Sequence, residues 1–140
     1  MASHTLLEGE TTNHVIGAFF EVYNTLGFGF LEHVYAEALE WELVERARSV
    51  HKEVVVPVYY KGAVLSTQRV DMIVDDTVIV ELKSTEILPI TAQRQLLNYL
   101  RATSFQVGLL LHFGPKPRFY RMVHSAKTFS ASIRGFRANS

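Results

Sequence analysis

The feature of this sequence that most constrains the fold is the stretch from Asp71 to Lys83, which reads DMIVDDTVIVELK. Two short apolar runs flank a polar centre at 75–77, and this pattern predicts a β-hairpin. The same stretch contains Asp71, Glu81 and Lys83, whose residue types are rarely buried unless they are paired or bound to a metal. The hairpin therefore combines two apolar strands with three charges that need partners.

The length of the turn decides whether the two acids of this hairpin meet. A two-residue turn at 75–76 would pair Asp71 with Val80, and the two carboxylates would point to opposite faces. A three- or five-residue turn pairs Asp71 with Glu81 and brings both carboxylates and Lys83 together, because a one-residue slip in register flips the face. We predict the longer turn, since two neighbouring carboxylates would repel each other without a cation between them.

The chemistry of these residues suits a divalent cation. Two carboxylates and a strand carbonyl form a set of hard oxygen ligands for Mg²⁺ or Mn²⁺. A lysine beside such a site can position or activate a water molecule. The alternative is an exposed antiparallel hairpin on which Glu81 and Lys83 form an ordinary surface pair. A D…ExK spacing is short and common, so the residues alone leave both interpretations open.

Length and composition fit one globular domain. The chain has 140 residues, 48% of them hydrophobic, which allows a sizeable core. It has no cysteine, which excludes disulfides and thiolate zinc sites and fits a reducing compartment. No apolar run approaches the roughly 18 residues that span a bilayer, and the N-terminus lacks the basic region of a secretion signal. We therefore expect a soluble, cytoplasmic protein.

The charges are balanced overall but unevenly distributed. Residues 1–50 contain eight acids and two bases, whereas residues 115–140 contain six bases and no acid. Such a basic end can meet phosphate, although basic termini are as often solubilising segments. The net charge of zero argues against tight nonspecific binding to duplex nucleic acid, which needs several phosphate contacts.

The rest of the pattern predicts the element order α-α-β-β-β-α-β-β. Apolar residues at helical spacing predict helices over about 12–26, 31–48 and 89–102, the first capped by Thr11 or Thr12 and ended by Gly27. Strands are expected over 54–60, over about 63–74, in the second half of the hairpin, over 107–112 and over 119–123. The strand that contains Pro57 is expected at an edge.

This order predicts a mixed α/β (α+β) fold, with helices packed on a central mixed sheet. We expect a single domain over residues 1–129 and a basic, poorly ordered tail over residues 130–140.

Several aromatic and histidine residues are expected to be structural. Phe19, Tyr23, Tyr35 and Trp41 fall at helical core spacing, which predicts packing rather than a base-stacking platform. The six histidines show no ligand-like pair spacing, so a zinc site is not expected, and His112 is expected to be a packed histidine. One of the two consecutive tyrosines at 59–60 must face outward, and a tyrosine exposed beside an edge strand is compatible with a homodimer.

Three motifs in a fixed order carry a family resemblance. The segment 29–35, GFLEHVY, precedes the D71…E81-L82-K83 hairpin, and the helical segment 95–99, QLLNY, follows it. Together they resemble the GxxExxY protein family, which is similar to the PD-(D/E)xK nuclease superfamily, specifically to members with a Q-x-x-x-Y helix motif. The resemblance runs from about Thr11 to Val123 and implies a restriction-endonuclease-like core. Val70 stands where the superfamily pattern has proline, a position that shapes the backbone only.

The resemblance implies a role for each residue of the hairpin site. Glu32 would be the helix acid that completes the metal site, and Asp71 would be the central ligand. Glu81 would be the second ligand and would orient the attacking water. Leu82 would lend its backbone carbonyl, and Lys83 would hold the water or stabilise negative charge that develops at phosphorus.

Gln95 and Tyr99 share one helix face and would contact water or substrate phosphate beside that site. The resemblance thus implies a nuclease-like phosphodiesterase that depends on Mg²⁺ (or Mn²⁺) and acts on nucleic acid. The alternative is a regulatory module that binds nucleic acid or protein on the same fold and cleaves little. The intact acids favour the enzyme, whereas the neutral charge and small size favour the module.

Overall fold

The computed structural model describes residues 6–125 and contains three helices and five strands in the predicted order. The predicted domain end at 129 and the tail 130–140 lie outside the described residues. The elements are α1 (Gly9–Leu26), α2 (Glu32–Glu45), β1 (Val50–Tyr60), β2 (Ala63–Val74), β3 (Val78–Lys83), α3 (Thr91–Ala102), β4 (Val107–Phe113) and β5 (Pro117–Val123).

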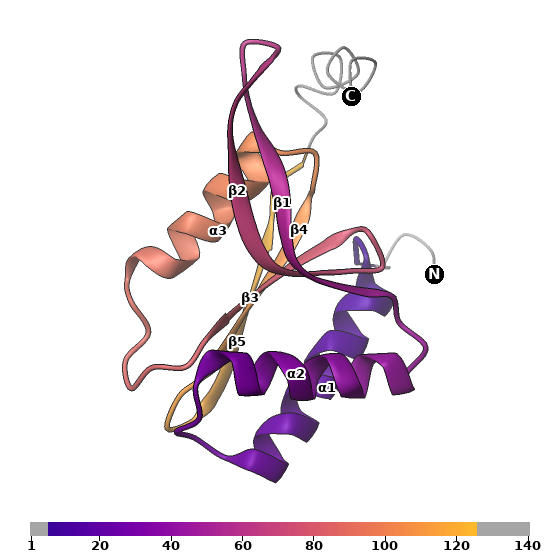
Figure 1. Cartoon of the computed structure of the whole chain (residues 1–140), viewed down its shortest axis with the longest axis vertical. Coiled ribbons are helices and arrows are strands. Elements are labelled where there is room, and N and C mark those ends of the chain that lie inside the picture. The colour runs from indigo at the N-terminus through magenta and orange to yellow at the C-terminus, as the bar shows by residue number, and fades with distance from the viewer. Residues whose placement is uncertain (1–5, 126–140) are drawn as a thin grey trace.

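The five strands form one mixed sheet in the order β1-β2-β3-β4-β5. All neighbouring strands are antiparallel except β3 and β4, which are parallel and are connected through α3. Helices α1 and α2 pack on one face of the sheet, where the larger cluster of buried side chains lies. Helix α3 covers the other face with a second cluster (Figure 1). The predicted mixed α/β fold with helices on a central sheet is confirmed.

The ends of α1 and α2 differ from the predicted ones. Helix α1 begins at Gly9, so Thr11 and Thr12 lie inside its first turn rather than at the cap, which is Glu8. Gly27 ends the helix with a φ of 72°, as predicted. Helix α2 ends at Glu45 rather than at residue 48, because the residues after it reverse the chain and Ala47 adopts a φ of 61°.

Trp41 is not a core residue, contrary to the prediction. Only positions 35, 39 and 43 of α2 are buried, and their spacing of four places them on one narrow stripe. At about 100° per residue, Trp41 lies opposite this stripe, and its side chain is 68% exposed. Val44, on the same side of the helix as Trp41, is 58% exposed. Phe19 and Tyr35 are fully buried and Tyr23 packs against the same cluster, as predicted.

Strands β1 and β2 form a hairpin that is longer than the rest of the sheet. β2 pairs with β3 only over 72–74, so residues 63–70 of β2 pair with β1 alone. In Figure 1 the far end of this hairpin projects beyond the other strands. Lys61 and Gly62 make its turn with positive φ angles, and Tyr60 beside the turn is 56% exposed. β1 is an edge strand, as the prediction for Pro57 required.

Candidate active site

The turn of the β2–β3 hairpin has the predicted odd length. Asp75 and Asp76 both adopt left-handed φ angles, of 55° and 59°, and the Thr77 N–H donates to the Val74 carbonyl at 3.1 Å. Thr77 is then an additional residue, because Val74 pairs with Val78. This register brings Asp71 level with Glu81, which is the arrangement that the longer turn was expected to produce.

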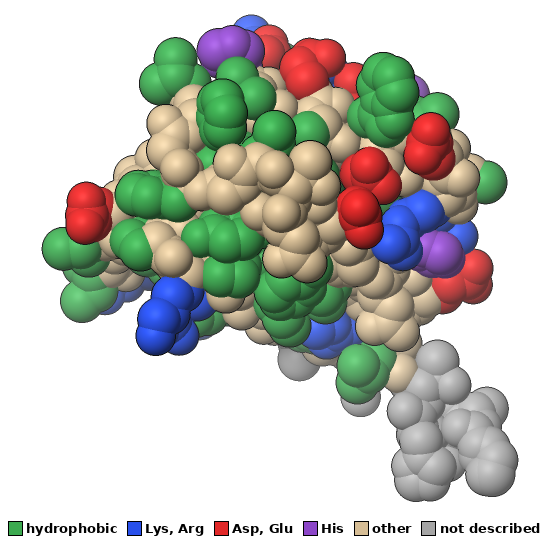
Figure 2. Space-filling view, turned by 90° about the horizontal axis from the view of Figure 1, so that it is seen from below, with side chains coloured by type: hydrophobic (Ala, Val, Ile, Leu, Met, Phe, Trp, Pro, Cys, Tyr) green, Lys and Arg blue, Asp and Glu red, His purple; other side chains and the backbone are tan. Residues whose placement is uncertain are grey.

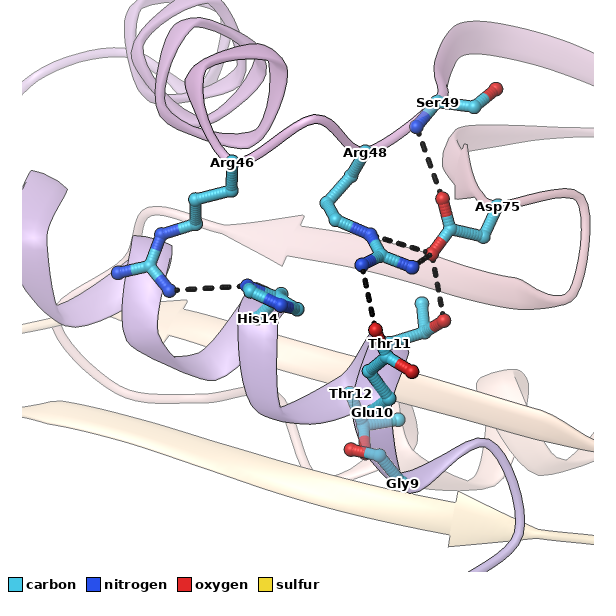
Figure 3. Close-up of polar contacts among 9 residues, drawn as sticks. All are labelled: Gly9, Glu10, Thr11, Thr12, His14, Arg46, Arg48, Ser49 and Asp75. Carbon is cyan, nitrogen blue, oxygen red and sulfur yellow. Dashed lines mark hydrogen bonds and ion pairs between the residues drawn. The ribbon is translucent and has the colours of Figure 1, made fainter.

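A polar network fixes this turn to α1 and to the start of β1 (Figure 3). The Asp75 carboxylate accepts hydrogen bonds from Arg48 Nε at 2.9 Å, Thr11 Oγ1 at 2.7 Å and the Ser49 N–H at 3.0 Å. Arg48 also pairs with Glu10 at 3.1 Å. Burial alone would raise the pKa of Asp75, but the hydrogen bonds and charge of Arg48, with Thr11 and Ser49, outweigh it and lower the pKa.

The two acids of the hairpin lie side by side where β2 and β3 separate. The β2–β3 pairing ends at Met72 and Val80. Beyond this point the Leu82 N–H donates to the Asp71 carboxylate at 2.8 Å, so a side chain takes the place of a strand carbonyl. The Asp71 N–H lies 3.4 Å from a Glu81 carboxylate oxygen. The separation of the strands therefore makes room for two carboxyl groups between them.

The backbone of β2 is distorted at Asp71. Val70 packs in the cluster beneath α3, whereas Met72 packs in the cluster beneath α1 and α2. Regular alternation would place both on one face, so β2 must twist sharply at Asp71. On β1, Glu53 lies opposite Asp71, is skipped by the pairing, and has a φ of 53°. At this twist Asp71 lies close to α2, with which it lines a cleft.

Glu81 is electrostatically suited to receive a cation. Burial raises the pKa of Glu81 to about 8, with a further contribution from the negative charge of Asp71, while Lys83 acts in the opposite direction. Without a cation, Glu81 therefore keeps its proton at neutral pH. A divalent ion would replace that proton, and the carboxylates of Asp71 and Glu81 supply the hard oxygen atoms that such ions prefer.

A cleft of about 220 Å³ connects this hairpin to α2. The lining residues come from α2, β1 and the hairpin, and they are Glu32, His33, Ala36, Glu37, Lys52, Glu53, Asp71 and Leu82. Glu32 lies in the first turn of α2, as predicted, and its carboxylate accepts the Ser84 N–H at 3.1 Å. The Ser84 hydroxyl donates to the Phe30 carbonyl at 2.5 Å, which ties the chain after β3 to the start of α2.

The structure thus brings Glu32, Asp71 and Leu82 to one cleft, with Glu81 against Asp71 and Lys83 close enough to Glu81 to lower its pKa. Glu81 and Lys83 do not line that cleft. Within residues 6–125, no three His, Asp or Glu side chains stand close enough together to hold a metal as they are arranged.

Gln95 and Tyr99 lie on one face of α3 and form a chain of hydrogen bonds. Gln95 Nε2 donates to the Tyr99 hydroxyl at 2.9 Å, and that hydroxyl donates to Gln68 Oε1 at 3.3 Å. Burial raises the pKa of Tyr99, and the charge of Glu81 adds to this effect. Tyr99 therefore lies within electrostatic reach of Glu81.

Sequence reasoning missed two partners of this site, Gln68 and Ser84. Gln68 lies three residues before Asp71, and Ser84 directly follows Lys83. Nearness in sequence to the hairpin motif was the one signal that could have identified them. His112 is a packed histidine, as predicted, since it is buried and its Nε2 lies 2.9 Å from the Thr85 carbonyl.

Comparisons with known proteins agree with this architecture. The family model of the PD-(D/E)XK nuclease superfamily matches residues 9–122. Among solved structures, the chain is similar to the crystal structure of SSO0001, with a TM-score of 0.51, 20% identity, and coverage of 78% of this chain. The chain spans 59% of the length of that protein, and the likeness concerns the fold alone.

An alkaline exonuclease (LHK-Exo) from Laribacter hongkongensis aligns with a TM-score of 0.49 and 9% identity, over 91% of this chain and 76% of its own. No curated protein sequence matches the chain significantly. In the part of the chain that the structure describes, no helix has the length and apolarity to cross a membrane.

Proposed function

This chain belongs to the PD-(D/E)XK nuclease superfamily, and on that premise we propose that it is a divalent-metal-dependent phosphodiesterase that cleaves nucleic acid. Its mixed sheet with helices on both faces is restriction-endonuclease-like. The observation that supports catalysis is the pairing of Asp71 with a partly buried Glu81 whose pKa is raised to about 8. Two adjacent, partly buried carboxyl groups add nothing to the stability of a hairpin, but they suit the divalent metals that nucleases of this superfamily generally use.

We assign Asp71, Glu81 and the Leu82 carbonyl as the residues that would hold Mg²⁺ or Mn²⁺, with Glu32 as the fourth contributor. Glu32 lines the cleft beside Asp71 and has only to exchange its hydrogen bond with Ser84 to take part. When bound, the divalent cation would supply a Lewis acid that activates water for attack on phosphorus and neutralises charge on the phosphate.

The side chains of the site would divide the remaining work. Glu81, as a carboxylate, would orient the attacking water, and Lys83 beside it would hold that water or stabilise the charge that develops at phosphorus. Gln95 and Tyr99, already joined by a hydrogen bond, would contact water or the phosphate from the α3 side. Gln68 would fix the direction of the Tyr99 hydroxyl.

We further propose that the chain is a GxxExxY protein, from the segment 29–35, and that it works in the cytoplasm. The exposed Tyr60 at the end of the edge strand β1 offers a surface on which a homodimer could form. A second candidate function is a binding or regulatory module on the same fold. The observation in its favour is that the carboxylates of residues 6–125 are not gathered into a three-ligand cluster.

Cleavage of labelled single- and double-stranded DNA and RNA with Mg²⁺ or Mn²⁺ tests the proposal. Wild type would be compared with Asp71→Ala, Glu81→Ala and Lys83→Ala, and we expect each variant to lose about 10²-fold or more in rate. Asp76→Ala is the matched control, because Asp76 lies in the turn of the same hairpin with its side chain 79% exposed. The nuclease proposal would be contradicted if the wild-type protein cleaved no substrate. It would also be contradicted if all three variants cleaved as fast as wild type.

A thermal melt separates the two candidate functions when no substrate is cleaved. Binding of Mg²⁺ or Mn²⁺ to the native state would raise the melting temperature, and Asp71→Asn would abolish the increase. A metal-dependent increase without cleavage would favour the binding module. No increase in wild type would contradict the metal site itself.

A further inference from the structure

The single tryptophan of the chain lies on the surface, in a shallow hollow that adjoins the candidate active-site cleft. Trp41 and Val44 form its apolar floor, and Glu37, Glu40 and Glu45 line it. Figure 2 views the molecule from the end where α1 and α2 lie in Figure 1, and it shows acidic and hydrophobic side chains close together there. Single exposed apolar residues are ordinary. An exposed tryptophan and valine that are surrounded by three acids instead form an apolar patch with a polar rim, which is typical of a binding surface.

The charges of the hollow indicate what kind of partner fits. Lys52 contacts both Glu37 and Glu40 from β1, and it neutralises one of the three negative charges. An excess of negative charge therefore remains around an exposed indole ring. A partner that complements this surface has basic side chains separated by aromatic ones, because cations pair with the carboxylates and aromatic rings pack against tryptophan.

The chain itself contains such a segment. Residues 126–140, AKTFSASIRGFRANS, hold the bases Lys127, Arg134 and Arg137, the aromatics Phe129 and Phe136, and no acid. This segment lies outside the described residues. We propose that residues 126–140 dock onto the Trp41 hollow of the same molecule, with aromatic side chains against Trp41 and Val44 and basic side chains toward the acids.

Length and tethering both permit this docking. Fifteen extended residues span about 50 Å, and a domain of about 120 residues has a radius of gyration of only about 14 Å. Covalent attachment gives the segment an effective concentration in the millimolar range, so an affinity of about 1 mM is enough to cover the hollow about half of the time. The proposal does not depend on nuclease activity, because neither Trp41 nor the segment belongs to the proposed site.

Trp41 provides the measurement, since it is the only tryptophan and its emission reports on its own exposure. The full-length wild type would be compared with the full-length triple variant Lys127→Glu, Arg134→Glu, Arg137→Glu. We expect wild-type emission at shorter wavelength and weaker quenching by acrylamide than in the triple variant. Added salt should shift the emission and quenching of the wild-type protein toward those of the triple variant, because salt screens the ion pairs.

A second triple variant, Arg94→Glu, Arg101→Glu, Lys116→Glu, is the matched control, since it changes the net charge equally at exposed positions outside the segment. Its emission wavelength and its quenching by acrylamide should equal those of the wild-type protein. Equal emission and quenching in wild type and the segment variant would overturn the proposal. A shielding of Trp41 that grows with protein concentration would also overturn it, because a second copy would then be the occupant.

Discussion

At the scale of single residues, the proton on Glu81 links the candidate site to stability. In the folded, metal-free protein the pKa of Glu81 is about 8, above its ordinary value of 4.5. Between these two values the unfolded chain is ionised while the folded chain keeps the proton, so stability falls as pH rises from about 4.5 to 8. Glu81→Gln removes this dependence, and we expect it to stabilise the metal-free protein at pH 8 by about 1–3 kcal/mol.

Urea unfolding in the presence of a chelator, at pH 5 and pH 8, measures this effect. Glu32→Gln is the control, because Glu32 is an exposed acid of the same cleft. The expectation fails if wild type and Glu81→Gln lose stability equally between the two pH values. With divalent ions present at pH 8, the wild-type protein should be more stable than Glu81→Gln, since only wild type has the carboxylate that would bind them.

The residues of the site were predictable in part. The pairing of Asp71 with Glu81 was predicted from the chemistry of the two acids, because alternation alone allowed either turn length, and the register of the hairpin agrees with that prediction. The contact of Leu82 N–H with Asp71 was not predictable, since it requires the strands to separate. The left-handed backbone at Glu53 was not predictable either, because a residue other than glycine rarely adopts a positive φ.

At the scale of elements, the hydrogen bonds of Asp75 fix the position of the β2–β3 hairpin, which contains Asp71 and Glu81. Asp75 joins the β2–β3 turn to Thr11 of α1 and to Arg48 before β1. We expect Asp75→Asn to destabilise the protein by about 1–2 kcal/mol, because the ion pair and its hydrogen bonds are partly buried. The pKa of Asp75 is lowered, so its contribution is present above about pH 4 and is lost as pH falls further.

Chemical denaturation at pH 7 and pH 3 checks this prediction, with Asp76→Asn as the control. Asp76 lies in the same turn but is mostly exposed, so its substitution should change stability by less than about 0.5 kcal/mol. If both variants lost the same free energy of unfolding, the hydrogen bonds and ion pair of Asp75 would not contribute to stability.

The contact between α3 and β4 depends on the absence of a side chain at Gly108. A Cβ there would lie 2.9 Å from a Leu96 methyl group, and Leu96 is buried in the α3 cluster. We expect Gly108→Ala to destabilise the protein by about 1–3 kcal/mol, because α3 must move away from the sheet. Activity should fall with it, since α3 carries Gln95 and Tyr99.

Gly17→Ala is an informative comparison in thermal melts. The three atoms nearest to a Cβ at Gly17 all belong to the flexible end of Arg46, and alanine is the better helix former, so this variant should be neutral or slightly stabilising. Equal melting temperatures for the Gly108→Ala and wild-type proteins would contradict close packing of α3 on β4.

Most elements could be predicted, because their apolar periods are strong. The errors lie where tertiary context overrides a pattern. Helix α2 has apolar residues on more than one side, and the sequence does not say which stripe meets the core, so Trp41 was wrongly placed inside. Thr11 has the chemistry of a cap, but its hydroxyl bonds to Asp75, which is 64 positions away in the sequence.

At the scale of the whole molecule, element order indicated a mixed sheet with helices packed on it, and the structure confirms this fold. The sequence did not indicate that β3 and β4 would be the parallel pair at the centre, because strand partners are chosen by long-range packing. It also did not indicate which helices would share a face. Those choices set the position of α3 opposite α2, with the site hairpin between them.

The long β1–β2 hairpin has a consequence for how the molecule opens. Near its tip, residues 63–66 of β2 bond to one neighbouring strand, whereas residues 72–74 lie between two. Amide protons near the tip should therefore exchange with solvent by local opening, and those of 72–74 and 107–111 only when the domain unfolds. Native-state hydrogen exchange followed by mass spectrometry measures this, and equal protection along β2 would contradict it. A single strand would thus contain two regimes of motion, a tip that opens locally and a segment at 72–74 that opens only on unfolding, and Asp71 lies at the boundary between them.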